Sequence, residues 1–216
     1  TWDPVTKQYT TVMTGWSLID TFSTPDEKLS LTAGVHHHSV NTSHNDDKSA
    51  SGTRDQSSAT SPIWGLTYKV TPETTIYPNH TETFSEGGTV GVGYLNSGDT
   101  IPPAKTKQNE LGVKFKNGAF LHTLSAFKNT QQSSITVPDT TDPTKSWYTL
   151  DGENEYKGLE YSAVGALNDK WDMIFGIAYM DAEKTKTQGG ANDGRKVCGI
   201  PKWSGDLALT YKPDKA

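Results

Sequence analysis

The stretch DKWDMIFGIAYMD (residues 169–181) alternates between two kinds of side chain. One set is large and apolar: Trp171, Met173, Phe175, Ile177 and Tyr179. The residues between them are Asp172, Ile174, Gly176, Ala178 and Met180. A period of two residues predicts a β-strand that carries the two sets on opposite faces. The fold then depends on what covers the large apolar face, which is either a second sheet or lipid.

The composition is that of a folded chain rich in strands. Of the 216 residues, 32% are apolar and 10% are aromatic, and the mean hydropathy is -0.65. Such an aromatic, well-patterned chain is not a disordered one. The formal net charge of -5, without a basic run between aromatic residues, predicts no nucleic-acid partner. No apolar run reaches the length of a transmembrane helix, and the one cysteine, Cys198, cannot form an internal disulfide.

Nine segments are predicted to be β-strands, and no convincing amphipathic helix of ten residues is found. The predicted strands are 9–20, 29–40, 61–71, 73–84, 105–116, 119–130, 153–166, 169–182 and 201–212. They run to about 11–14 residues, whereas globular strands are most often about 5–6 residues long. A transmembrane β-strand needs about 9–11 residues, so the lengths favour a membrane barrel.

The connections between these strands alternate between short and long. The short ones, 23–28, 71–73, 117–118 and 167–170, have the residues of tight turns. The long ones, 41–60, 85–104, 131–152 and 183–200, are rich in Ser, Thr, Gly, Asn and Asp. This alternation predicts an up-and-down meander with turns at one end and long loops at the other. Outer-membrane barrels have that asymmetry, and a soluble sandwich has no reason for it.

Aromatic residues bound the apolar face of two predicted strands. Trp171 and Tyr179 are eight residues apart on one strand, and so are Trp203 and Tyr211 on another. Eight residues of strand cover about 26 Å. Aromatics at both ends of an aliphatic face match the two girdles at the water interfaces of a membrane barrel. For a single strand the core of a soluble β-sandwich explains the same pattern, so this alternative stays open.

Four stretches resemble TonB-dependent outer-membrane receptors of the siderophore class. SPIWGLTYKVTPETTIYPNHTETF (61–84) resembles a hairpin of that family, and PPAKTKQNELGVKF (102–115) resembles its PxxxxQxELGxKY strand. DGENEYKGLEYSAVGAL (151–167) resembles its (R/K)GxELxxxG strand. GGANDGRKVCGIPKWSGDLALTY (189–211) resembles the loop and strand that end in GxPxxxxxLxxxY. The four occur in family order, and the resemblance covers nearly the whole chain from about residue 12.

The resemblance implies an all-β, antiparallel up-and-down transmembrane barrel of about 22 strands, closed by a plug domain, in the bacterial outer membrane. It also implies a ferric siderophore as ligand and a TonB energy-coupling complex that acts through a TonB box. Outer-membrane lipid and lipopolysaccharide are its expected surroundings. All of residues 1–216 are expected to belong to the barrel domain, without plug or TonB box. About nine strands cannot close such a barrel, so an internal portion of a longer receptor is expected. The alternative is a soluble secreted β-sheet binding module, such as a carbohydrate-binding sandwich.

Two clusters of polar side chains contain residue types that can bind a metal ion. VHHHS (35–39) places His36 and His38 on one strand face and His37 on the other, with His44 six residues further on. Imidazole is a common metal ligand. The prediction is nevertheless a solvated rim that a substrate touches through His36 and His38, without a metal. Alternate acids at Asp151, Glu153 and Glu155 lack the later ligands of a calcium loop, so a polar wall inside the barrel is predicted there.

Three aromatic residues are candidates for ligand binding. Tyr94 lies in the glycine-rich segment GGTVGVGYLNSGD (87–99), which is predicted to be a mobile extracellular loop. Trp147 and Tyr148 lie in KSWYTLDG (145–152), also a predicted loop or rim. The resemblance implies that such residues line the siderophore site. Ordinary interfacial or loop-packing aromatics are the alternative.

No catalytic signature is present, and no cofactor is predicted. The sequence has no GxSxG, HExxH or CxxC motif, and Cys198 lies near no His–acid arrangement. An outer-membrane barrel enzyme would need a serine beside a histidine on one face. His122 and Ser125 are three residues apart in a predicted strand, which puts them on opposite faces. The chain is therefore predicted not to be an enzyme.

Overall fold

The computed structural model describes residues 7–46 and 53–213, and side chains within residues 10–43 and 56–213. The strands are β1 (Lys7–Ser23), β2 (Leu29–Asp46), β3 (Thr53–Thr71), β4 (Thr74–Phe84), β5 (Gly88–Thr89), β6 (Thr100–Ile101), β7 (Lys105–Asn117), β8 (Phe120–Pro138), β9 (Ser146–Asn168), β10 (Trp171–Lys186) and β11 (Trp203–Tyr211). One short 3-10 helix, η1 (Gln188–Gly190), follows β10. Among the described residues, no helix is long and apolar enough to cross a membrane.

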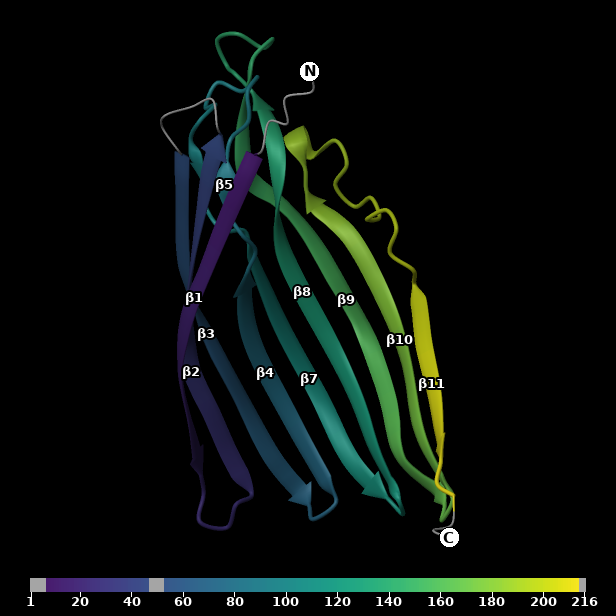
Figure 1. Cartoon of the computed structure of the whole chain (residues 1–216). Coiled ribbons are helices and arrows are strands. Elements are labelled where there is room, and N and C mark those ends of the chain that lie inside the picture. Colours follow the sequence, from purple (N-terminus) through teal and green to yellow (C-terminus); the bar gives the residue numbers. More distant parts are fainter. Residues whose placement is uncertain (1–6, 47–52, 214–216) are drawn as a thin grey trace, which may run out of the picture.

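Nine of the strands form one antiparallel sheet in the order β1-β2-β3-β4-β7-β8-β9-β10-β11 (Figure 1). Within this sheet each strand pairs only with the strands that come directly before and after it in the order of the chain, when β5 and β6 are set aside. This confirms the predicted up-and-down meander. The other two strands, β5 and β6, pair with each other inside the connection from β4 to β7. Strands β1 and β11 are the two outer strands of the described sheet, so this sheet is an open portion of a barrel.

The sheet has no second layer packed against it in the described part of the chain (Figure 1). Among the described residues only five apolar side chains are buried, and none of them completely: Val40, Val90, Phe127, Ala163 and Ala182. Large apolar residues such as Leu207 are instead more than half exposed. A soluble sandwich buries the inner faces of two sheets against each other. The alternative of a soluble sandwich is therefore wrong.

The two ends of the sheet differ as predicted. Short turns at residues 24–28, 72–73, 118–119 and 169–170 lie together at the lower end in Figure 1, which we call the turn end. The connections 85–104 and 139–145 lie at the opposite, loop end, and the connection 187–202 begins there and runs along β10 to the start of β11. Gly118 adopts a φ of 57°, a conformation that glycine takes without a steric cost, and it closes the tight turn from β7 to β8.

Four strands continue much further toward the loop end than predicted. Strand β2 extends to Asp46 and β3 begins at Thr53, so most of the predicted loop 41–60 is strand. Strands β8 and β9 likewise take up most of the predicted loop 131–152. The extensions of β2 and β3, residues 41–46 and 53–60, are almost entirely polar, so they lack the alternation that predicts strands. Backbone pairing continues there because both faces are in water and need no apolar side chains.

The apolar face of the sheet is bounded by two pairs of aromatic rings. The register places Trp171 opposite Tyr211 and Tyr179 opposite Trp203, and the ring centroids are 5.0 Å apart in each pair. Met173, Phe175 and Ile177 lie between the two pairs, opposite Leu209, Leu207 and Gly205. The alternation in residues 169–181 therefore continues across the sheet. It forms an apolar band between two aromatic girdles, as expected of a lipid-facing surface.

Candidate functional site

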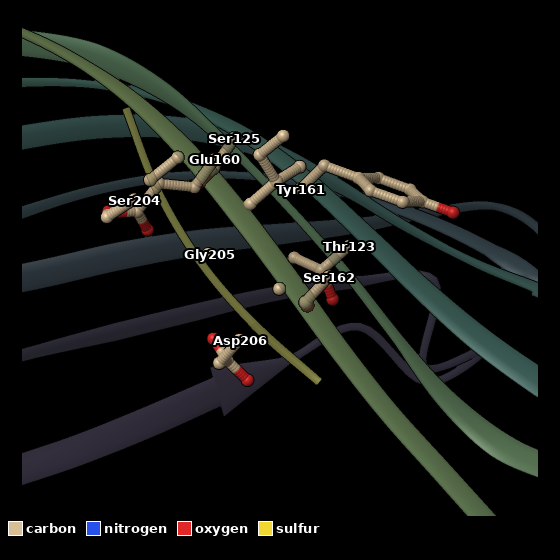
Figure 2. Close-up of a pocket in the computed structure, with 11 residues that line it drawn as sticks. Thr123, Ser125, Glu160, Tyr161, Ser162, Ser204, Gly205 and Asp206 are labelled. Carbon is tan, nitrogen blue, oxygen red and sulfur yellow. The ribbon is translucent and has the colours of Figure 1, made fainter. Parts of the chain in front are cut away.

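The opposite, polar face carries a pocket of about 400 Å³ over β8, β9, β10 and the edge strand β11 (Figure 2). Glu160 and Asp206 contribute its carboxylates, and serine and threonine hydroxyls surround them. Gly176 lies beneath Asp206, since a Cβ on Gly176 would come 2.5 Å from a carboxylate oxygen of Asp206. This confirms that Gly176 lies on the polar face, which is the interior of a barrel. None of the predicted ligand-binding residues lines this pocket.

A second pocket, of about 440 Å³, lies at the loop end, and we call it the rim pocket. Two of the predicted aromatic residues meet there, because the rings of Tyr94 and Tyr148 are in edge contact with centroids 5.4 Å apart. The rim pocket is lined by Tyr94, Ser133, Ser134, Ile135, Thr136, Tyr148, Asn154, Lys184, Lys186, Thr187, Gln188 and Asn192. It thus combines aromatic rings, amides, hydroxyls and two ammonium groups.

The loop from β4 to β7 reaches the rim pocket by pairing with the start of β9. The backbone N–H of Leu95 donates to the carbonyl of Ser146 at 2.9 Å. The amide side chain of Asn96 bonds both backbone groups of Tyr148, donating to its carbonyl at 2.9 Å and accepting from its N–H at 3.0 Å. Asn96 therefore replaces a missing strand partner and fixes Tyr94 against Tyr148. The segment predicted to be a mobile loop, 87–99, contains β5, which pairs with β6 just after the segment, and makes these bonds.

The rim pocket has a positive charge in a chain that is negative overall. Lys184 and Lys186 line it, and no carboxylate does. Neither lysine side chain is paired with an acid in the part of the chain that the structure describes. Sequence analysis missed both lysines, although their spacing of two residues near a strand end places them on one face and offered a signal. The pocket is thus suited to an anionic ligand.

Trp147 does not join Tyr148 in the rim pocket. Both residues belong to β9 and not to a loop, and neighbours along a strand point to opposite faces. The indole N–H of Trp147 donates to Asp139 in the connection from β8 to β9, at 3.1 Å. The hydroxyl of Thr141 and this indole lower the pKa of Asp139 to about 2. Trp147 therefore packs on its own hairpin connection.

The histidines also lie apart from the rim pocket. His36 and His38 are on the polar face of β2, as their spacing predicts, but neither lines the pocket. His37 lies on the other face and stacks on Trp16 with centroids 5.5 Å apart. The side chain of His44 lies outside the described residues. Within the described ranges, no group of three or more His, Cys, Asp or Glu side chains is placed to hold a metal ion.

The rim pocket also excludes four other residues considered in the sequence: Glu155, His122, Ser125 and Cys198. Glu155 does not contribute to a polar interior wall as predicted, because it follows the face of Leu159 and pairs with Lys128 at 2.7 Å. His122 bonds the Tyr161 hydroxyl at 2.8 Å on the apolar face, whereas Ser125 is buried in the pocket of Figure 2. The predicted separation of His122 and Ser125 is thus confirmed. Cys198 is exposed and forms no disulfide.

An open antiparallel meander with an apolar outer band, aromatic girdles and a polar inner face defines a portion of a transmembrane β-barrel. Residues 2–215 match the family of TonB dependent receptor-like β-barrels, and the chain belongs to this family. Proteins of this family are β-barrels of the Gram-negative outer membrane.

Three relatives show the range of this likeness. A ferrichrome receptor of Yersinia enterocolitica is 30% identical over 193 residues, which cover 86% of this chain and 25% of that protein. A metal-pseudopaline receptor of Pseudomonas aeruginosa is 30% identical over 157 residues, or 71% of this chain and 21% of that one. The crystal structure of the ferric preacinetobactin receptor from Acinetobacter baumannii gives a TM-score of 0.81 at 33% identity, over 96% of this chain and 31% of that one. The chain therefore spans only about a fifth to a third of these relatives.

Proposed function

We propose that this chain forms part of the barrel wall and extracellular rim of a receptor that takes up a ferric siderophore. The observation that carries the proposal is the rim pocket, where the rings of Tyr94 and Tyr148 meet beside two lysines at the loop end. The names of the relatives support the same class of ligand, since they include receptors for ferrichrome and ferric preacinetobactin. The soluble binding module has no such support.

The chemistry of the rim pocket favours an anionic chelate. Aromatic rings offer flat apolar faces to the organic part of a siderophore. Lys184 and Lys186 attract negative charge, and no lining carboxylate opposes them. Ferric complexes of catecholates are anionic, whereas ferric tris-hydroxamates are neutral. The pocket should therefore discriminate between the two by charge, and the reaction is binding and release without covalent chemistry.

Transport belongs to the whole receptor. In this family the barrel is closed by a plug domain, and an inner-membrane TonB complex drives uptake through a TonB box. The pocket of Figure 2 lies on the polar face, with Glu160 and Asp206 turned toward the barrel interior. We expect this part of the wall to face the plug and the rim pocket to face the external medium.

Substitutions in the rim pocket test the proposal. In the intact receptor, Tyr148→Ala should raise the Kd for a ferric tris-catecholate about tenfold, which corresponds to about 1.4 kcal/mol, because one wall of the pocket is removed. Lys184→Gln combined with Lys186→Gln should weaken the anionic complex by a similar factor and leave a neutral ferric tris-hydroxamate within about twofold. The effect of the lysines should shrink as salt is added. Titration calorimetry or quenching of intrinsic fluorescence measures each Kd.

Trp147→Ala is the matched control, since Trp147 is the neighbour of Tyr148 in β9 but lies outside the rim pocket. It should leave each Kd unchanged. Equal losses in the Trp147 and Tyr148 variants would show that the hairpin matters only for folding. Unchanged binding in the Tyr148 and lysine variants would place the ligand elsewhere.

We further propose that the outer surface beside the apolar band binds the phosphate groups of lipopolysaccharide. Glu155 is shared by Lys128 at 2.7 Å and Lys157 at 3.5 Å. In the same way Lys105, at 3.1 Å, and Lys107, at 3.6 Å, share the buried side chain of Glu82. Each of these two carboxylates thus has two ammonium groups beside it, and Asp181 and Glu183 of β10 lie opposite Lys157 and Glu155 on the same face. Phosphorylated headgroups of the outer leaflet fit such a surface.

This surface is tested by the lipopolysaccharide that purifies with the receptor. Replacement of the four lysines by glutamine should lower the bound lipopolysaccharide severalfold, measured as phosphate per receptor. Replacement of Lys28 and Lys69, which pair with acids at the turn end, should have no effect. Retention of normal phosphate by the fourfold variant would contradict the proposal.

A further inference from the structure

His36 and His38 form a pair on the polar face of β2. The register places Ser17 of β1 opposite His36 and Gly15 opposite His38. The two imidazole rings have centroids 6.3 Å apart and are tilted by 45°. Ser61 and Ala59 of β3 lie on their other side, so no charged residue is their direct partner in either neighbouring strand.

The ring of His36 is held in a defined orientation. Its Nδ1 lies 2.7 Å from the hydroxyl of Ser17, so the hydrogen bond leaves Nε2 as the nitrogen that can bind a ligand. The ring lies over Gly15, since a Cβ there would be 3.4 Å from Cε1 and 3.8 Å from Nε2 of His36, and its closest contact would be the carbonyl oxygen of His37 at 3.0 Å. A bond to the nitrogen that does not bind the metal is the usual way in which proteins orient a metal-binding histidine.

We propose that His36 and His38 chelate one divalent transition-metal ion on the inner wall of the barrel. Imidazole suits copper, nickel and zinc, and each nitrogen binds at about 2.0–2.1 Å from the ion. Both rings lie on one face of β2 with centroids 6.3 Å apart, because alternate residues of a strand share a face, so an ion between them can be reached by a nitrogen of each. Two protein ligands leave the other positions of the ion open, so the site binds metal exchangeably. Cu²⁺ binds most tightly, following the general order of divalent metals.

This site is separate from the rim pocket, which neither histidine lines. It does not depend on the identity of the siderophore. His37 provides an internal comparison, because it belongs to the same tripeptide but bonds Thr60 at 2.9 Å and stacks on Trp16 on the apolar face.

The test is a titration of the detergent-purified receptor with Cu²⁺, after removal of any affinity tag. The natural receptor and the His37→Gln variant should bind one Cu²⁺ with equal affinity. His36→Gln and His38→Gln should each weaken binding at least tenfold, because one nitrogen cannot chelate. The electron paramagnetic resonance spectrum of bound Cu²⁺ should show two coupled nitrogens in the natural receptor and lose one in either variant.

Folding is monitored in parallel by circular dichroism, so that a variant with an altered barrel is recognised. Ser17→Ala provides a second measurement, since it should lower the affinity for Cu²⁺ while leaving both nitrogens in the spectrum. The proposal would be overturned if His37→Gln lowered the affinity for Cu²⁺ as much as His36→Gln does. A spectrum with two nitrogens that persists in the His36 and His38 variants would overturn it too.

Discussion

Phe175→Arg should destabilise the barrel by about 2–4 kcal/mol, the cost of an arginine on a lipid-facing strand at mid-membrane. Phe175 lies four residues from Trp171 and four from Tyr179, midway between the two girdles. Its side chain is opposite Leu207 and has its ring centroid 6.2 Å from that of Tyr161. A guanidinium at this depth is far from both water interfaces. Equilibrium unfolding of the receptor in lipid vesicles measures the change in free energy.

Two variants separate the lipid effect from simple loss of a phenylalanine. Phe175→Leu keeps an apolar side chain and should cost far less. Ala178→Arg introduces the same charge on the opposite face of β10, opposite Glu160, and should be tolerated better. An arginine at position 175 that costs no more than one at position 178 would show that the apolar face does not meet lipid.

Gly158→Ala should lower the unfolding free energy by about 1–3 kcal/mol or more, as expected when atoms are added to a site without space. A Cβ on Gly158 would lie 2.1 Å from the carbonyl oxygen of Tyr179 and 2.8 Å from the ring of Phe127. The carbonyl belongs to the backbone of the next strand, so it moves only if β9 and β10 separate locally. Because Tyr179 forms one of the girdle pairs with Trp203, the strain reaches the membrane interface. Denaturant unfolding in micelles measures the loss.

Gly65→Ala is the matched control for this prediction. Gly65 lies in β3 of the same sheet, but its added Cβ would meet only ordinary contacts, with Cβ of Asn79 at 3.7 Å and the carbonyl oxygen of Pro78 at 3.8 Å. This change should be nearly neutral. Equal losses at the two glycines would mean that close approach is not the cause of the loss at position 158.

The membrane-spanning half of each strand was predictable from sequence, because lipid on one side and water on the other impose a period of two. Residues 169–181 show this most clearly, and their Trp and Tyr spacing matched the girdles. Polar extensions such as the end of β2, residues 41–46, were not predictable in this way. Water wets both of their faces, so nothing in the residue pattern separates a paired strand from a loop.

The candidate site was predictable only in part. The aromatic residues of the loop segments were predicted as candidates, and the structure brings the rings of Tyr94 and Tyr148 together. Their meeting depends on Asn96 bonding the backbone of β9, a contact between residues 52 apart that no local pattern reveals. Strand alternation explains why Trp147 turns away, but it applies only once residues 146–168 are known to form one strand. Lys184 and Lys186, which line the same pocket, were not among the predicted residues.

The pairing of every strand with its neighbours in the chain also bears on how the sheet is made. Closing a short connection costs little conformational entropy, and the turn at residues 118–119 is among the shortest in the sheet. The sheet can therefore grow by one hairpin at a time, each new strand meeting an edge that already exists. The long connection between β4 and β7 is the slowest step in such growth, since its two strands must find each other across twenty residues, 85–104. We expect assembly to pause there, with β1–β4 and β7–β11 formed as separate halves.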